Sequence, residues 1–239
     1  MDKLPQIYFL HHSAVCINIK DCLLIFDHCL YRPDGCVEDG AVGDKYIANA
    51  RRVYVFVSHS HHDHFNSRIF EWASPHVKFL LDDTVPTVSA PKDSVFMRCG
   101  SKYEDEYISV QEFGSTDCGG SFFVVCGNTS FFHAGDLNDW HWKDHGDKRY
   151  SRIMSGLFKH EIKRIKQSAG TIDYAFFPVD KRMGADFDSG ADYFIETLRP
   201  RFFIPIHFVS FEDTLAYKNK MRNSGTNVLE IQKNGQRLV

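Results

Sequence analysis

The chain has 239 residues, of which 43% are hydrophobic and 25% are charged, and its formal net charge is −3. This composition is ordinary for a globular protein and excludes collagen, coiled coils and long disordered segments. The length suits one large domain or two small ones, and the slightly acidic charge does not favour nonspecific binding to nucleic acid.

The first half of the chain consists mainly of short apolar or alternating runs, which are typical of strands. The stretch 31–50 is rich in Asp and Gly and predicts a loop, whereas residues 66–73 predict a helix. We expect strands over residues 7–10, 15–19, 23–26, 52–58, 77–81, 94–98 and 107–112, and a hairpin formed by 121–125 and 129–133.

The second half alternates between helical and strand-like segments. Apolar residues at helical spacing predict a helix over 151–168, and Asp188-Ser189 is placed to cap a helix that runs through 193–198. No linker or repeat interrupts this order, so we predict one domain over residues 1–239 in which helices cover the sheets. The remaining elements are a helix over 212–222 and strands over 172–179, 201–206 and 228–231.

Histidine is unevenly spread, because four of the 13 histidines lie in the stretch His59-Ser-His-His-Asp-His64. This stretch follows a predicted strand, so we expect its first half to be extended. In an extended chain residues two apart lie on the same side, which brings His59 and His61 together. The turn that follows can bring Asp63 and His64 to a second position. Because imidazole and carboxylate groups bind zinc, iron and manganese, the motif predicts a metal site rather than a merely solvated loop.

Other residues that can bind metal lie at the ends of other predicted strands. Asp136 follows the run TSFF in the sequence His133-Ala-Gly-Asp136, His207 follows FFIPI, and Asp27 follows LLIF. Strand ends meet at one edge of a sheet, where ligands and catalytic groups collect. Singly, such a histidine is more often packed and a Gly-Asp pair is more often a turn. Together with the histidine-rich motif they predict that Asp136 and His207 are metal ligands.

The order of these residues resembles the metallo-β-lactamase superfamily over nearly the whole chain, from LLIFD to PIHF. The resemblance implies an α/β fold, the four-layer αββα sandwich, with up to two metal ions in a cleft at one edge. It implies that Asp136 bridges the metals and that Asp27 orients the motif. It further implies that one metal is bound by His59 and His61, and the other by Asp63, His64 and His207. The segments FHAGDLN and PIHF are most similar to an uncharacterised or lactonase-like bacterial branch.

The sequence departs from the superfamily at one position. A further histidine usually precedes the Gly-Asp pair, but the matching stretch here, Ser115–Ser121, contains none. The first metal therefore lacks a ligand unless His133 or Asp117 supplies it, or else only one metal is tightly held. We predict that His133 lies close to the metals, either as a ligand or as a residue that orients a ligand or transfers a proton.

The predicted chemistry follows from the metal, because a divalent ion lowers the pKa of a bound water to about 7 and polarises a carbonyl or phosphoryl oxygen. We expect a metal-dependent hydrolase that uses a metal-bound hydroxide on a small ester, lactone or phosphoester. Its cofactor would be one or two zinc ions, with manganese and iron as alternatives. Asp63 and His133 are the candidate catalytic residues. The competing interpretations are a nuclease acting on RNA or DNA, a di-iron redox protein on the same scaffold, and a metal-binding protein without catalysis.

Two segments beyond the ligands are candidates for contact with substrate. Trp140, His141 and Trp142 follow Asp136 and can form an aromatic wall over the site; an ordinary loop packed on its own tryptophans is the equal alternative. The stretch Asp180–Gly184 follows another predicted strand, where it can place a cation near the site. A solvated turn is the favoured interpretation of that stretch.

The cysteines and the apolar runs bear on location. The seven cysteines are an odd number with no Cys-x-x-Cys pair, which predicts free thiols in a reducing compartment. The first 20 residues show no secretory signal, and no apolar run approaches the roughly 20 residues that a membrane-spanning helix needs. We expect a cytoplasmic protein that acts on a small molecule, without a membrane or nucleic-acid partner, and the sequence does not indicate an oligomeric state.

Overall fold

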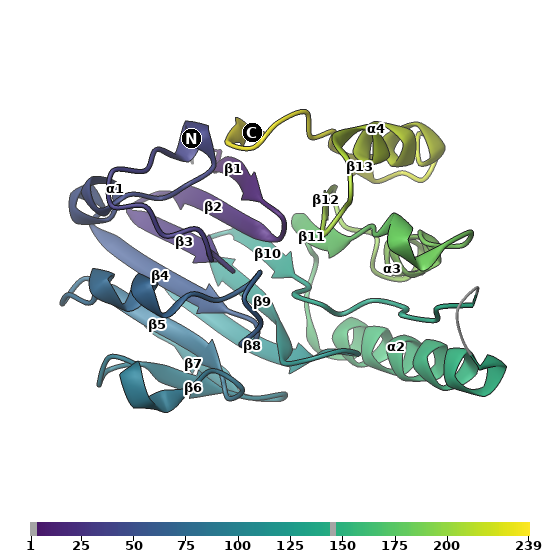
Figure 1. Ribbon diagram of the computed structural model, residues 1–239, viewed down its shortest axis with the longest axis horizontal. Helices are drawn as coiled ribbons and strands as arrows, with labels where there is room; N and C mark the ends of the chain where they lie inside the picture. Colours follow the sequence, from purple (N-terminus) through teal and green to yellow (C-terminus); the bar gives the residue numbers. More distant parts are fainter. Residues whose placement is uncertain (1–3, 144–146) are drawn as a thin grey trace. The chain divides into compact units, whose positions relative to one another are not determined.

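The computed structural model describes residues 4–143 and 147–239, and the described chain divides into two compact units. Unit 1 takes the described residues up to Arg98 together with Ile231–Val239, and unit 2 runs from Cys99 to Glu230. Figure 1 shows each unit as a sheet with its own connecting helices and loops.

The sheet of unit 1 has seven strands in the order β14-β1-β2-β3-β4-β5-β6. Neighbouring strands are antiparallel from β14 to β3 and parallel from β3 to β6. The last residues of the chain therefore close this sheet beside its first strand (Figure 1). The strands are β1 (Gln6–His11), β2 (Ala14–Ile19), β3 (Cys22–Phe26), β4 (Arg52–Val57), β5 (Val77–Asp82), β6 (Val95–Met97) and β14 (Gln236–Arg237).

Short crossovers connect the parallel strands of unit 1, and they cover one face of its sheet. Every residue of β3 and all but the first of β4 are buried, which explains why both read as continuous apolar runs. Ile69 and Trp72 of η2 pack in one hydrophobic cluster with Val53 and Val55 of β4. The crossovers contain α1 (Asp44–Asn49) and the 3-10 helices η1 (Val37–Asp39), η2 (Ser67–Trp72) and η3 (Thr87–Ser89).

The sheet of unit 2 also has seven strands, in the order β13-β12-β11-β10-β9-β8-β7. It follows the same plan as unit 1, because its strands are antiparallel from β7 to β10 and parallel from β10 to β13. The strands are β7 (Lys102–Glu104), β8 (Ile108–Gly114), β9 (Gly120–Cys126), β10 (Thr129–His133), β11 (Tyr174–Pro178), β12 (Phe202–Ile206) and β13 (Asn227–Val228).

Longer helices form the crossovers of unit 2: α2 (Lys148–Ser168), α3 (Ser189–Leu198) and α4 (Phe211–Lys220), with the 3-10 helix η4 (Lys181–Met183). Phe158 and Ile162 of α2 and Phe194 of α3 pack against Phe132 and Phe177 of the sheet. Because strand side chains alternate between faces, His133 lies on the face of β10 opposite Phe132, away from this cluster.

Several elements differ from the sequence-based predictions. The stretch 31–50 is not wholly a loop, because it contains η1 and α1, and residues 66–73 form a 3-10 helix rather than an α-helix. Strand β7 was not predicted, since its three residues are mostly exposed and polar. Asp188 does occupy the N-cap position of α3, but its side chain pairs with Lys220 at 2.7 Å instead of capping the helix.

Two findings bear on the predicted location. All seven cysteines are free thiols. Among the described residues, no helix combines the length and the hydropathy that crossing a bilayer requires.

Candidate metal centre

The histidine-rich motif of unit 1 follows β4 directly, in the loop that leads to η2. Because β3 and β4 are parallel, their carboxyl ends meet, and Asp27 after β3 lies beside Ser58 after β4. The chain then turns: the backbone N–H groups of His64 and Phe65 both donate to the carbonyl of His61, at 3.0 and 2.8 Å. The second half of the motif is therefore turned, as predicted.

His59 and His61 face each other across a short gap. His59 Nε2 lies 3.0 Å from His61 Nδ1, and the ring centroids are 4.5 Å apart. Two nitrogens that each lie about 2.0–2.1 Å from a tetrahedral zinc ion are about 3.3–3.4 Å apart, so this separation is close to that of two ligands on one ion. His59 is fully buried, whereas His61 is exposed.

Asp27 fixes the other buried histidine of the motif. Its carboxylate accepts hydrogen bonds from the N–H and the hydroxyl of Ser58, both at 2.7 Å, and from Nδ1 of His64 at 2.8 Å. A carboxylate at Nδ1 places the proton there and leaves Nε2 of His64 as the nitrogen that can bind metal. Asp27 thus makes the contacts of an orienting residue, the role that the superfamily resemblance implies.

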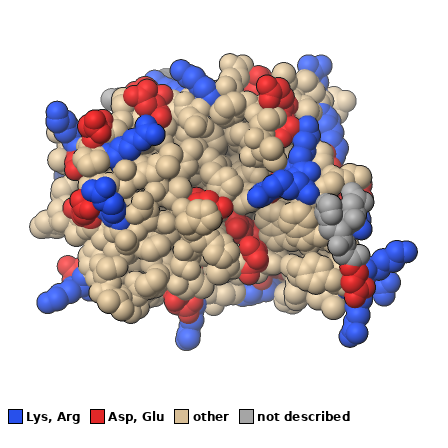
Figure 2. Space-filling view, viewed as in Figure 1, with Lys and Arg blue, Asp and Glu red and all other residues tan. Residues whose placement is uncertain are grey.

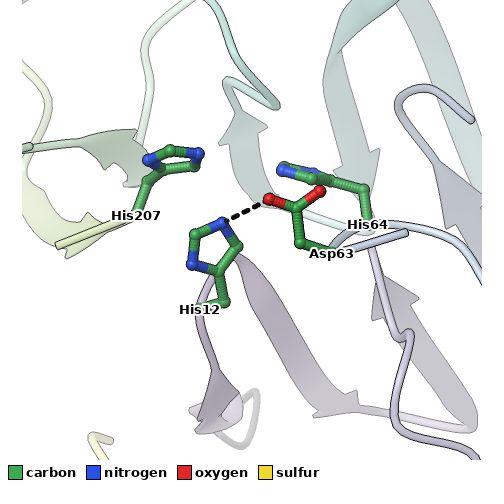
Figure 3. A group of neighbouring side chains, drawn as sticks. All are labelled: His12, Asp63, His64 and His207. Carbon is green, nitrogen blue, oxygen red and sulfur yellow. Dashed lines mark ion pairs between the residues drawn. The ribbon is translucent and has the colours of Figure 1, made fainter. Parts of the chain in front are cut away.

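Asp63 is half-exposed and meets a histidine that the sequence analysis did not select. His12 Nε2 lies 3.3 Å from Asp63 Oδ2 (Figure 3). His12 comes from the β1–β2 turn, and its ring stands edge-on to that of His64, with centroids 5.5 Å apart. The available signal was the pair His11-His12 after the predicted strand 7–10, which is similar to the signal that identified His207.

In unit 2, Asp136 and His207 come from the ends of parallel strands in the same sheet. Asp136 follows β10 and His207 follows β12, and Asp136 Oδ1 lies 3.6 Å from His207 Nε2. Both side chains are buried. The structure therefore brings these two predicted ligands together at a separation that suits one ion.

Asp180, at the end of the intervening strand β11, holds His207 as Asp27 holds His64. Its carboxylate accepts from His207 Nδ1 at 3.0 Å and from the Arg182 guanidinium. Burial alone would raise the pKa of Asp180, but hydrogen bonds from His207 and Arg182 hold that pKa well below its usual range. The favoured prediction for Asp180–Gly184, a solvated turn, is wrong for Asp180, because this residue is completely buried.

The aromatic segment after Asp136 supports the ligands more than it forms an open wall. Trp140 is buried, donates from its indole N–H to the backbone oxygen of Asp136 at 2.7 Å, and packs edge-on against His207. Trp142 stacks on Trp140 with centroids 6.0 Å apart. His141 is also buried, and both of its ring nitrogens contact backbone groups, of Asp186 and Lys143. Of the three, Trp142 is the one with partial exposure.

The two candidates for the absent histidine differ in their surroundings. His133 is fully buried, and its Nδ1 accepts a hydrogen bond from the N–H of Gly135 at 3.2 Å. Asp117 is exposed, and one of its carboxylate oxygens lies within 4.8 Å of a carboxylate oxygen of Asp136. Of these two candidates, Asp117 is the one whose possible ligand atom is grouped with that of Asp136, and the role of His133 stays a prediction.

Comparison with known proteins shows which proteins this chain is similar to. No family model matches the chain. A curated relative, a UPF0173 metal-dependent hydrolase from Nanoarchaeum equitans, is 22% identical over 258 residues, which span 95% of this chain and 97% of the relative.

Three solved structures are similar over nearly all of this chain. A metallo hydrolase from Ignicoccus hospitalis superposes with a TM-score of 0.69 and 16% identity, over 98% of this chain and 97% of the other. The metallo-β-lactamase fold protein YhfI from Bacillus subtilis gives 0.60 and 11%, over 97% and 98%. CmlA, a diiron β-hydroxylase from Streptomyces venezuelae, gives 0.65 and 10%, over 97% of this chain and 53% of CmlA.

These likenesses confirm the fold predicted from the sequence, the αββα sandwich of the metallo-β-lactamase type. They also bear out the resemblance to that superfamily, since the similar proteins are named as its fold members and as metal-dependent hydrolases. The comparisons do not assign individual metal ligands, so the choice of ligands rests on the residues of this chain.

Proposed function

We propose that this chain is a metal-dependent hydrolase that acts on a small ester, lactone or phosphoester. The observation that carries the proposal is the pairing of metal-binding atoms in each unit: His59 with His61 at 3.0 Å, and Asp136 with His207 at 3.6 Å. Histidine nitrogens and carboxylate oxygens at such separations are the donor set of catalytic zinc sites.

The proposed centre would hold one or two zinc ions. As the superfamily resemblance implies, His59 and His61 would hold one ion and Asp63, His64 and His207 the other, with Asp136 shared by the two. This assignment rests on the order of the residues in the sequence and on the ligand pairs within each unit. A divalent ion at such a site supplies a Lewis acid and lowers the pKa of bound water to about 7.

The chain's own residues have separate tasks in this proposal. Asp27 and Asp180 keep the protons of His64 and His207 on Nδ1, so that the opposite nitrogens remain available. Asp63, whose side chain is 39% exposed, would accept a proton from a bound water. His133 is the second candidate for proton transfer.

Charge supports a small substrate over a nucleic acid. The net charge is −3, and on the face shown in Figure 2 the Lys and Arg side chains are interspersed with Asp and Glu. A nuclease would need a continuous basic track along its substrate, and its binding would weaken steeply with salt.

Metal analysis and a substrate panel test the proposal together. Protein purified without added metal should contain zinc, and it should hydrolyse at least one member of a panel of esters, lactones and phosphodiesters. His59→Ala should lose both properties. His62→Ala, which changes an exposed histidine of the same loop, is the matched control. Full hydrolysis by protein shown to be metal-free would contradict the proposal.

A di-iron oxidation catalyst is the second candidate, and the structural likeness to CmlA favours it. Histidine and carboxylate ligands suit iron as well as zinc. Iron in the purified protein, together with visible absorption that changes on reduction, would replace the hydrolase proposal with this one.

A further inference from the structure

His12 occupies the two-residue β1–β2 turn in a backbone conformation that is uncommon for a histidine. Six non-glycine residues among those described have positive φ, and His12 is one of them, at 45°. Two-residue hairpin turns favour Gly or Asn in this region, because a larger side chain is strained there. Asp27 and His207, which also have positive φ, are the orienting carboxylate and the predicted ligand described above. Such strain tends to cluster at functional sites.

The side chain of His12 points at the metal-binding motif of its own unit. Its Nε2 lies 3.3 Å from Oδ2 of Asp63, and Figure 3 shows the imidazole turned toward that carboxylate. One ligand atom from each of His12, Asp63 and His64 lies within 4.8 Å of the others. Three side chains from two separate loops of unit 1 thus direct metal-binding atoms at one point.

The separation of His12 and Asp63 matches that of the predicted ligand pairs. It falls between the 3.0 Å of His59 and His61 and the 3.6 Å of Asp136 and His207. It also equals the spacing of about 3.3–3.4 Å expected for two ligand atoms on a tetrahedral zinc ion. A charge-assisted hydrogen bond between imidazole and carboxylate is usually shorter, about 2.7–2.9 Å.

We propose that His12 is a further metal ligand, which binds through Nε2 to the ion held by Asp63 and His64. This inference rests on the proposed function, because it concerns the same metal centre. It assigns an imidazole from the β1–β2 turn to the centre of a chain that lacks one of the usual histidines.

Zinc binding by two variants of His12 tests the proposal. His12→Gly removes the imidazole and suits the left-handed backbone, so the metal-free variant should melt at the same temperature as the parent or higher. His12→Gln keeps an N–H donor for Asp63 but replaces a good zinc ligand with an amide. His62→Ala is the matched control. The measurements are zinc affinity by chelator competition, the visible spectrum with cobalt(II), and melting without metal.

A ligand role predicts that both His12 variants bind one zinc ion at least about 10-fold more weakly, the lower end of the loss seen when even an outer partner of a ligand is removed. The cobalt(II) spectrum should change as a nitrogen ligand is lost. Unchanged zinc affinity in His12→Gly would overturn the inference. So would parent-like affinity in His12→Gln alone, because it would assign His12 a hydrogen bond to Asp63. If the parent protein itself bound no metal, the proposed function would fall and not this inference alone.

Discussion

Units 1 and 2 share one arrangement, in which a buried carboxylate accepts a hydrogen bond from Nδ1 of a histidine. The two units differ in the other hydrogen-bond partners of that carboxylate. In unit 1, Asp27 holds His64 and is otherwise satisfied by the N–H and hydroxyl of Ser58. In unit 2, Asp180 holds His207 and is otherwise satisfied by Arg182, whose side chain is 59% exposed. Neutral donors inside the fold are indifferent to salt, whereas an exposed guanidinium is screened by it. The orienting contact of unit 1 should therefore be the more robust of the two.

The largest effect should come from removing one ligand in each unit. If both units serve one centre, His59→Ala and His207→Ala should each reduce hydrolysis to background and lower the bound metal. The double variant should be no worse than either single one, because ligands of one centre act as a unit. His62→Ala and His160→Ala change an exposed histidine in each unit and serve as controls. Full activity after loss of His207 would confine the centre to unit 1.

The next largest effect concerns His133 in unit 2, which is not part of the two carboxylate–histidine contacts compared above. Since its Nδ1 already accepts from Gly135, we expect a role in proton transfer through Nε2. His133→Ala should keep its metal and turn over about 100-fold more slowly or worse. Asp117→Ala should instead lose metal. A fall in metal content in His133→Ala would make His133 a ligand, and parent-like metal and turnover would make it a packing residue.

Replacing each orienting carboxylate tests directly whether the contact in unit 1 is more robust than the contact in unit 2. Asp27→Asn and Asp180→Asn should each weaken metal binding or activity by about 10- to 100-fold, the usual effect of losing a partner behind a metal-binding histidine. The loss should be larger for Asp27, because its other donors, the N–H and hydroxyl of buried Ser58, are shielded from solvent, whereas the guanidinium beside Asp180 is largely exposed. Zinc affinity of the two variants, measured side by side, decides the order. Equal losses would remove the distinction between the units.

Acid should affect unit 1 at a higher pH than unit 2. Burial lowers the pKa of His28 from its ordinary value of 6.5 to about 4. The unfolded chain therefore binds the proton first, and the stability given by neutral His28 is present above about pH 6.5 and is lost as the pH falls toward 4. The corresponding loss for Asp180, whose pKa is lowered, occurs only below its ordinary value of 3.8.

His28→Gln should reduce this acid sensitivity by up to about 3 kcal/mol between pH 6.5 and pH 4, since each unit of pKa shift is about 1.4 kcal/mol. The glutamine carbonyl can accept the N–H of Val42, which His28 Nε2 accepts in the parent. Denaturant unfolding of metal-free protein across this pH range makes the measurement, with His62→Gln as control. If the free energy of unfolding fell equally with pH in His28→Gln and in the parent, His28 would not be the source of the acid sensitivity.

The smallest effect should come from Arg182→Gln. This change removes the exposed cation beside Asp180 but leaves the contact of Asp180 with His207. Because the guanidinium is 59% exposed and Asp180 keeps its hydrogen bond from His207, activity should fall only a few-fold. As the salt concentration is raised, the activity of the parent should approach that of the variant. A salt-independent difference would show that Arg182 acts by another route.

The sequence by itself determined the order of strands and helices and the central motif. The spacing of His59, His61, Asp63 and His64 directly after a strand was enough to predict that they cluster, because an extended chain followed by one turn leaves little choice. Strand β10 was predicted to the residue. Short elements with weak patterns were missed or misjudged, among them β7, β14, η1, α1 and η2.

Only the tertiary structure decided which residues stand behind and beside the ligands. Asp180 and His207 are 27 positions apart and meet because β11 and β12 are parallel neighbours. His12 contacts Asp63 from the β1–β2 hairpin, which is distant from Asp63 in the sequence. Local sequence carries no signal for such pairs, since any aspartate after a strand can be a solvated turn and any histidine in a hairpin can be a surface residue. Their role depends on which strand ends the sheet brings together, and that is settled by the packing of the whole unit.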